Sequence, residues 1–266
     1  MDSKTVLITG ASSGIGLACA RRLAGEGHEV LLASRRENLL QRAAEEINED
    51  GGQADYLPLD LSEESSIESV AQKLLQRASS PDILVNNAGY GIYGLVEDIP
   101  LEEARQLFET NFFGALALTR KLLPALKASD SGRIVNVASG VAKRGFPVMN
   151  YYSASKAALE SMSECLQQEL RPYDITVQVV YPLRTETGFS DSARRYVPED
   201  FSFPAAGPTQ TAEEVAEAIS RGLETDKFRI HPHPSTKLLG VLNEISPLFT
   251  AQLLTMKDIV TSALQS

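Results

Sequence analysis

The sequence contains no tryptophan, and it has few of the residues from which disulfide frameworks and metal sites are built: two cysteines and three histidines among 266 residues. Cys19 and Cys165 lie within apolar helical patterns, which indicates small buried side chains in a reduced compartment rather than a disulfide pair. His231 and His233 alternate with prolines and have no acidic residue or cysteine beside them. We therefore expect no metal site.

Long apolar runs and an excess of basic residues are also missing. No stretch of about 18 apolar residues occurs, so we expect no integral membrane segment. The 35 acidic residues exceed the 25 basic ones, and the net charge of −10 argues against nucleic acid as a partner. The N-terminus enters an apolar run almost at once without a leader pattern, so we expect a cytoplasmic protein.

The first apolar run, Thr5 to Thr9, is followed by a glycine-rich turn and a helical pattern. The run is typical of a strand buried in a parallel sheet, and 43% hydrophobic residues suffice for one large α/β domain. A glycine turn between a strand and a helix favours binding of a pyrophosphate, because backbone N–H groups can approach it closely. The cofactor-binding turn is predicted to comprise Gly10, Ser12, Ser13, Gly14, Ile15 and Gly16.

The second predicted strand, residues 29–34, ends in two arginines. At this place an acidic residue would suit the ribose of NAD, whereas an arginine would suit the 2′-phosphate of NADP. Arg35 and Arg36 therefore favour NADP, although both could instead be surface charges that open the helix over 37–50. Asp60 follows a third strand, over 56–59, and could accept from the adenine amino group or cap a helix that runs from Ser62 to residue 78.

A fourth strand, residues 83–85, leads into Asn86, Asn87, Ala88 and Gly89, where we expect backbone bracing and cofactor contact. Further along, Tyr152 and Lys156 lie one turn apart on a helix over 150–170, so an ammonium would lower the pKa of a phenol. Ser139 would hold the oxygen that this phenol protonates. A Tyr-x-x-x-Lys spacing also arises by chance, with the tyrosine half-buried beside a solvated lysine.

These motifs together resemble the short-chain dehydrogenase/reductase family over about residues 4–222, and the branch with hydroxysteroid and retinol dehydrogenases in particular. The resemblance implies a doubly wound Rossmann fold with a mainly seven-stranded parallel sheet and helices on both faces. It also implies that Asn111, in a helix over 101–128, joins Ser139, Tyr152 and Lys156 as a catalytic residue that holds a water reaching Lys156. Cofactor contacts are implied at Asn87, Ala88, Gly89, Tyr152, Lys156, Pro182, Thr185 and Thr187. Leu183 departs from the family's glycine, which alters the loop that reaches the nicotinamide.

The chain is expected to form a single domain, 1–266, with a substrate lid over about 188–210 and a helical C-terminal tail over about 236–265. The lid lacks clear periodicity, and a helix with a capping box at Thr211 and Glu214 follows it. Apolar residues suggest a pocket for a bulky hydrophobic carbonyl or alcohol. The predicted pocket residues are Tyr90, Tyr93, Val141, Phe146, Met149 and Phe189.

The function expected from these residues is transfer of a hydride between NADP(H) and a hydrophobic ketone, aldehyde or secondary alcohol, with tyrosine as general acid/base. Two alternatives stay open: an NAD(H)-linked alcohol dehydrogenase, and a catalytically idle NADP-binding regulator. Arg194 and Arg195 leave room for an acidic substrate. The resemblance implies a homodimer or homotetramer built through the helices over 101–128 and 150–170.

Overall fold

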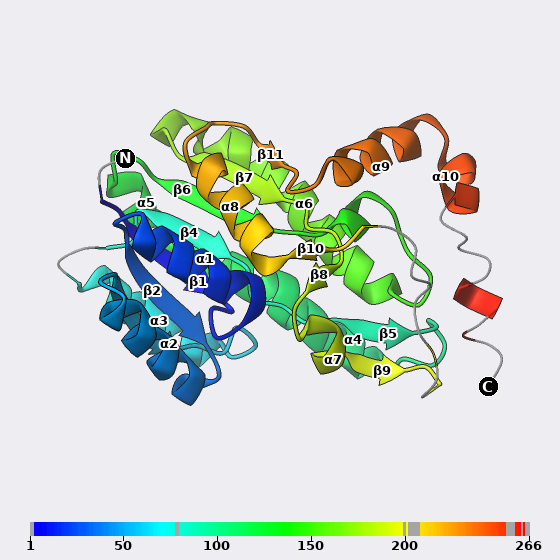
Figure 1. Cartoon of the computed structure of the whole chain (residues 1–266), viewed down its shortest axis with the longest axis horizontal. Helices are drawn as coiled ribbons and strands as arrows, with labels where there is room; N and C mark the ends of the chain where they lie inside the picture. The colour runs from blue at the N-terminus through cyan, green and yellow to red at the C-terminus, as the bar shows by residue number, and fades with distance from the viewer. Residues whose placement is uncertain are drawn as a thin grey trace.

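The computed structural model describes residues 3–77, 80–198, 201, 208–253, 259–261 and 263. Within them, seven parallel strands form one sheet in the order β11-β7-β6-β4-β1-β2-β3 (Figure 1). The strands are β1 (Thr5–Thr9), β2 (Glu29–Ser34), β3 (Gln53–Pro58), β4 (Ile83–Asn86), β6 (Arg133–Val137), β7 (Thr176–Val180) and β11 (Arg229–Ile230). The order reverses direction between β1 and β4, so the fold is a doubly wound Rossmann sheet, as expected.

Helices cover both faces of the sheet, because alternate side chains of each strand point to opposite sides and both sets are apolar. Val6 and Ile8 pack towards one face, and Leu7 packs towards the other. The first face is covered by α1 (Gly14–Gly25), α2 (Glu37–Glu49) and α8 (Ala212–Leu223). The second is covered by α3 (Glu64–Leu75), α5 (Ala115–Ala128) and α6 (Asn150–Leu170).

The helix predicted over 101–128 is not one regular helix. It begins as α4 (Leu101–Phe108), continues as a π-helical turn, η1 (Glu109–Gly114), and ends as α5. Gly114 sits where a Cβ would lie 2.0 Å from the carbonyl oxygen of Leu61, so the helix approaches the loop after β3 very closely. π-Helical turns are rare and occur frequently at functional sites.

The stretch predicted as an irregular lid contains short regular elements. They are α7 (Phe189–Ser192), β9 (Arg194–Tyr196) and the first residue of β10 (Gln210–Thr211), and β8 (Thr185–Glu186) lies just before the stretch. β9 pairs in parallel with β5 (Ile92–Gly94), and β10 pairs with β8. Arg194 ties this segment to α4 through Glu103 and Gln106. Residues 199–200 and 202–207 of the predicted lid lie outside the described residues.

The boundaries of β3 and α3 differ from the sequence expectation, and the start of α8 is confirmed. β3 starts at Gln53 rather than at residue 56, and α3 begins at Glu64, with Glu63 rather than Ser62 as N-cap. The Ser62 hydroxyl donates to Asp60 Oδ1 at 2.7 Å instead of capping the helix. α3 ends at Leu75, with Gln76 as C-cap, rather than at the predicted residue 78, which lies outside the described residues. The capping box that opens α8 is formed by Thr211 and Glu214.

The C-terminal tail forms α9 (Pro234–Ile245) and α10 (Pro247–Leu253), which lie to one side of the sheet in Figure 1. Pro247 separates them, as expected from its missing N–H. α9 packs on a 3-10 turn, η2 (Gly140–Lys143), and a second such turn, η3 (Arg171–Tyr173), follows α6. Residues 254–258, 262 and 264–266 of the predicted tail lie outside the described part. None of the described helices is long and apolar enough to span a bilayer.

Candidate active site

The glycine turn after β1 has the shape that its sequence predicts. Gly10 and Gly14 both have positive φ, at 67° and 54°, which residues with a side chain rarely adopt. A Cβ on Gly16 would lie 2.5 Å from the Gly10 carbonyl oxygen and 2.6 Å from Asn87 Nδ2. The helix α1 can therefore start directly against the loop only because residue 16 is glycine. Thr187, from the loop after β7, lies 3.1 Å from the Cβ position of Gly14.

Thr9 and Asn87 lock this turn to the strand beside it. Asn87 Nδ2 donates to the carbonyl of Thr9 at 2.9 Å, and the N–H groups of Asn87 and Ala88 both donate to Thr9 Oγ1 at 3.0 Å. Thr9 was not among the predicted cofactor residues. One signal in the sequence could have identified Thr9. It is a hydroxyl residue that ends an apolar strand, next to the end of a second strand.

Arg36 lies over the serines of the glycine turn. Its guanidinium donates to Ser12 Oγ at 2.9 Å and to Ser13 Oγ at 2.7 Å. Arg35 is exposed beside it. Together the guanidinium and the two hydroxyls make a donor set suited to a phosphate group. This set and the glycine turn fit the phosphate groups of a dinucleotide.

Asp60 takes part in local structure, but it does not cap α3, which was one of the two roles weighed for it, because Glu63 is the N-cap and no side chain caps the helix. Its Oδ1 accepts from the N–H of Ser62 at 2.9 Å as well as from the Ser62 hydroxyl, and its own N–H donates to Ser66. The carboxylate thus shapes the turn into α3. A contact from this side chain to adenine stays a prediction.

Ser139, Tyr152 and Lys156 come together where β6 ends and α6 begins. The Ser139 hydroxyl lies close enough to the Tyr152 phenol to lower its pKa. The Lys156 ammonium lies 6.0 Å from the centroid of the Tyr152 ring and donates to the Val137 carbonyl at 2.9 Å. Val137 is the last residue of β6, so the same strand end carries Ser139 and anchors Lys156.

Burial dominates the protonation of this group. It raises the pKa of the Tyr152 phenol well above its ordinary value, while the hydrogen bond with Ser139 opposes that rise. Burial also lowers the pKa of Lys156 to about 8. The expectation that Lys156 brings the tyrosine pKa below its ordinary value is therefore wrong for this structure. Desolvation of the phenol is the largest effect on its pKa, and Tyr93 adds to the rise.

Asn111 lies in the π-helical turn η1, with its side chain against the main chain of Tyr90. Its Oδ1 accepts from the Tyr90 N–H at 3.0 Å, and its Nδ2 donates to the Tyr90 carbonyl at 3.0 Å and to Ser155 Oγ at 3.3 Å. A Cβ on Gly89 would lie 2.9 Å from Asn111 Oδ1 and 3.4 Å from Lys156 Nζ. Asn111, Gly89 and Lys156 are therefore immediate neighbours.

Ser155 was missed by the sequence reading. It is fully buried, and its hydroxyl donates to the carbonyl of Tyr152 at 2.8 Å while it accepts from Asn111. Its place directly before Lys156, on the buried side of a helix, was the available signal. Ser155 thus links the Asn111 amide to the helix that carries Tyr152.

The loop after β7 begins beside Ser139 and ends beside the glycine turn. The Pro182 carbonyl accepts from the Gly140 N–H at 2.8 Å, and Thr187 contacts the Gly14 position as described above. The Thr185 hydroxyl donates to the Leu183 carbonyl at 2.9 Å and accepts from Gln210. Thr187 is thus the better placed of the two threonines for a cofactor contact.

Of the predicted pocket residues, Phe189 lies directly against the phenol. Its ring centroid is 5.5 Å from that of Tyr152, with the rings tilted by 53°. Val141 donates its N–H to Ser139 Oγ at 3.3 Å, and Met149 forms a bridge with Gly94 of β5. The main-chain N–H of Phe146 lies 3.5 Å from Ser153 Oγ. Val141, Phe146 and Met149 thus lie near the start of α6 and Phe189 lies against Tyr152, and their role as a substrate pocket stays a prediction.

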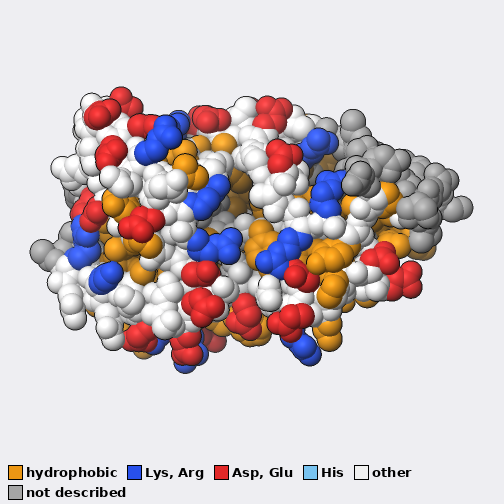
Figure 2. Space-filling view, turned by 90° about the horizontal axis from the view of Figure 1, so that it is seen from below, with side chains coloured by type: hydrophobic (Ala, Val, Ile, Leu, Met, Phe, Trp, Pro, Cys, Tyr) orange, Lys and Arg blue, Asp and Glu red, His pale blue; other side chains and the backbone are white. Residues whose placement is uncertain are grey.

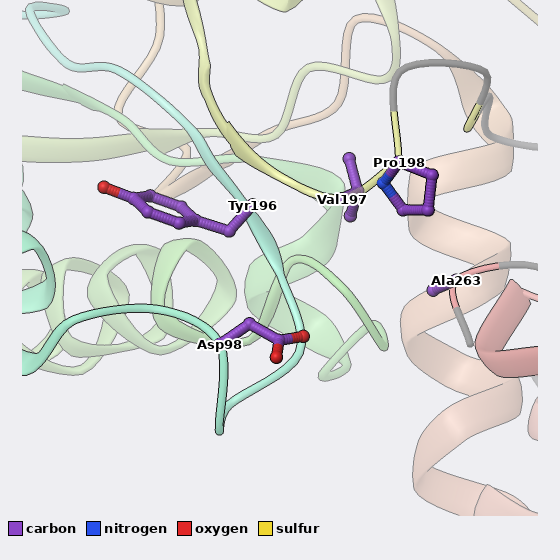
Figure 3. Close-up of a pocket in the computed structure, with 5 residues that line it drawn as sticks. All are labelled: Asp98, Tyr196, Val197, Pro198 and Ala263. Carbon is purple, nitrogen blue, oxygen red and sulfur yellow. The ribbon is translucent and has the colours of Figure 1, made fainter. Parts of the chain in front are cut away.

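A separate hollow of about 260 Å³ lies beside β9 (Figure 3). Its lining comprises Asp98, Tyr196, Val197, Pro198 and Ala263, and none of the predicted catalytic or pocket residues. The two histidines near the tail are engaged elsewhere: His231 Nδ1 lies 2.9 Å from Thr236 Oγ1, and His233 Nδ1 accepts from the Ser235 N–H to cap α9. Neither feature adds chemistry to the tyrosine site.

Comparison with known proteins agrees with this arrangement. Residues 4–197 match the family described as short chain dehydrogenase. The ketoacyl reductase HetN of Nostoc sp. is 34% identical over 253 residues, which cover 93% of this chain and 86% of that protein.

Two solved structures are similar over nearly the whole chain. A short chain dehydrogenase/reductase from Burkholderia phymatum in complex with NAD has a TM-score of 0.82 at 25% identity, covering 92% of this chain and 94% of that one. A short-chain dehydrogenase from Sphingobium yanoikuyae in complex with NADPH has a TM-score of 0.78 at 28% identity, covering 99% and 97%. The chain therefore belongs to the short-chain dehydrogenase/reductase family of oxidoreductases.

Proposed function

We propose that this protein is an NADP(H)-dependent oxidoreductase that interconverts a hydrophobic ketone or aldehyde with the corresponding alcohol. The observation that carries the proposal is the meeting of Ser139, Tyr152 and Lys156 beneath the lid residue Phe189. A hydroxyl donor, a proton-bearing phenol and an amine of lowered pKa are what carbonyl reduction needs at one place. HetN, the similar protein from Nostoc sp., is named as a ketoacyl reductase, which supports the same reaction class.

When bound, NADPH supplies the hydride for this reaction. Tyr152 gives its proton to the carbonyl oxygen, and burial keeps that proton in place until it is needed. Ser139 donates to the same oxygen and fixes its position. Lys156, with a pKa of about 8, exchanges protons near neutral pH and can restore the proton to Tyr152.

Asn111 is proposed to hold these groups in place. Its amide fixes the main chain of Tyr90 and, through Ser155, the turn of α6 that carries Tyr152. Three of the four hydrogen-bonding positions of its amide are occupied by these contacts. The remaining acceptor position on Oδ1 lies beside Lys156 and suits the water that the family resemblance implies.

A preference for NADP over NAD is supported by Arg36, which already bridges Ser12 and Ser13 beside the glycine turn. β2 ends in Ser34 and the two arginines, with no carboxylate to accept from a ribose hydroxyl. Figure 2 shows Lys and Arg side chains around the hollowed middle of one face, although acidic residues outnumber them in the chain.

Oxidation of NADPH and of NADH against a panel of hydrophobic ketones and aldehydes tests the proposal. The wild-type chain should consume NADPH faster than NADH at equal concentration. Arg36→Ala should raise the KM for NADPH about tenfold, the value of one charge-assisted contact, and leave that for NADH within about twofold. Arg42→Ala is the matched control, because Arg42 is an exposed residue of α2, the helix that has Arg36 as its N-cap. It should change the KM for neither cofactor.

Two results would contradict the proposal. A wild-type chain that prefers NADH would make it an NAD-linked alcohol dehydrogenase. A chain that binds NADPH tightly but turns over no member of the panel, in either direction, would make it a regulator with the same fold.

A further inference from the structure

A buried charged cluster lies beside the proposed catalytic group but outside it. The Lys143 ammonium pairs with Glu160 Oε1, and the two side chains are only 13% and 11% exposed. The hydroxyl of the fully buried Tyr181 donates to the same carboxylate oxygen at 2.8 Å. Removing one partner of a buried pair leaves an uncompensated charge, so such a pair fixes its neighbours far more firmly than an exposed pair does.

The three residues join the chain segments that surround Ser139. Lys143 is the last residue of η2, the turn that has Ser139 as its N-cap. Glu160 lies one helical turn beyond Lys156 in α6, and Tyr181 follows β7 directly before the loop at Pro182. The ion pair and the phenol therefore connect the serine turn to the helix of Tyr152 and to the cofactor loop.

The C-terminal helix α9 holds the same turn from its other side. Asn243 Nδ2 donates to the Lys143 carbonyl at 3.0 Å, and the Arg144 guanidinium donates to Asn243 Oδ1. Thr236 is fully buried, and its methyl group lies 3.4 Å from the Cβ position of Gly140. The turn η2 is thus held between α6 and α9.

η2 needs such support, because it has only four residues of 3-10 helix. Short 3-10 turns have poor hydrogen-bond geometry and little stability of their own. The Ser139 hydroxyl accepts from the N–H of Val141 at 3.3 Å, which leaves its proton free for the Tyr152 oxygen. Without anchors at the far end of the turn, the main chain of residues 139–143 could shift and carry the Ser139 hydroxyl away from Tyr152.

We propose that Lys143, Glu160 and Asn243 are positioning residues, which hold the turn over 139–143 so that the Ser139 hydroxyl stays on the Tyr152 phenol. This inference rests on the proposed function, because it assigns the cluster a role in the same reaction. It also gives the C-terminal helix a role, since α9 supports the site through the main chain of Lys143.

The test compares Glu160→Gln, Lys143→Met, the double variant and Lys143→Arg with the wild-type chain. Glu160→Gln keeps an acceptor for Tyr181 but removes the charge that holds Lys143. We expect kcat for ketone reduction to fall about 10- to 100-fold, as for a displaced positioning group, while NADPH affinity stays within about twofold. The double variant should lose no more than the worse single variant, and Lys143→Arg should keep most of the activity.

The pH profile of alcohol oxidation is the readout that a merely structural role would not move. In that direction Tyr152 must first lose its proton, and the hydrogen bond from Ser139 favours that loss, whereas burial and the nearby Tyr93 oppose it. Weakening the serine contact should therefore shift the rising limb of the profile to higher pH. Hydrogen exchange of the 139–144 segment should become faster in the same variants.

Glu46→Gln is the matched control, because Glu46 forms an exposed pair with Arg21 far from the turn. It should change neither kcat nor the profile. If the buried variants do not fold, Asn243→Ala removes the anchor on the Lys143 carbonyl without leaving a buried charge, and it should lower kcat and speed exchange of 139–144.

The inference is overturned if kcat stays within about twofold of wild type in folded variants. It is equally overturned if kcat falls while the exchange of 139–144 and the pH profile do not change. If the wild-type chain turns over neither ketone nor alcohol, the proposed function fails, and faster exchange in the variants still decides whether the cluster holds the turn.

Discussion

Lys156 gives the sharpest prediction about stability, because burial of its charged ammonium destabilises the folded protein. Its pKa is lowered from 10.5 to about 8 by burial. Between these two values the lysine is neutral in the folded protein and protonated in the unfolded chain. The unfolded state then binds more protons, so the free energy of unfolding rises as the pH rises through this window.

The magnitude follows from the shift. A difference of about 2.5 pKa units corresponds to roughly 3 kcal/mol, most of which is recovered between about pH 7 and pH 10. In Lys156→Met this term is absent. We therefore expect the variant to gain stability relative to wild type at the lower pH. The difference in unfolding free energy, variant minus wild type, should be about 2 to 3 kcal/mol larger near pH 7 than near pH 10. The variant also loses the hydrogen bond to the Val137 carbonyl, which lowers its stability by a similar amount at every pH. This loss therefore cancels when the two pH values are compared.

Urea unfolding of both proteins at several pH values measures this difference. Lys73→Met, at an exposed position of α3, controls for the general effect of removing a lysine. The variant should also lose catalytic activity at every pH, because the proton supply to Tyr152 is gone. A stability difference that does not change with pH would refute the reasoning that burial, rather than a partner, sets the pKa of Lys156.

Two further predictions concern the glycine turn and the lid. Gly16→Ala should destabilise the fold by about 1 to 3 kcal/mol in urea unfolding and weaken NADPH binding, since the added Cβ would meet the Gly10 carbonyl. Gly25→Ala, whose Cβ would meet nothing within 4 Å, should leave the unfolding free energy unchanged, and an equal loss of stability in both variants would contradict the close approach. Phe189→Ala should raise the KM for large apolar ketones about tenfold in steady-state assays, because the Phe189 ring packs against Tyr152. An equal rise in the KM for small ketones would contradict a role of Phe189 in the substrate pocket.

Much of this architecture could be predicted because the sequence patterns that specify it are local. The apolar runs, the glycine turn and the capping box of α8 each follow from a few adjacent residues. The π-helical turn at Asn111 could not be predicted, and neither could the close approach of Gly114 to the carbonyl of Leu61, some fifty positions away in the chain. The pairing of β9 with β5 likewise joins segments that are distant in sequence.

The candidate site was predictable in its members but not in its electrostatics. Spacing alone places Tyr152 and Lys156 on one helix face, yet it does not reveal that both side chains are buried. Burial raises one pKa and lowers the other, which reverses the expected effect on the tyrosine. Of the two arginines after β2, the sequence favoured Arg35 as the phosphate ligand, whereas the fold brings Arg36 onto Ser12 and Ser13.

The most direct test of the account is the activity of Tyr152→Phe with NADPH and a ketone that the wild-type chain reduces. The substitution removes one oxygen and leaves the ring that packs under Phe189. The account predicts that kcat falls by at least about 10² while the Kd for NADPH stays within about twofold. A variant that keeps wild-type turnover would show that the proton comes from another group and would contradict the proposed mechanism.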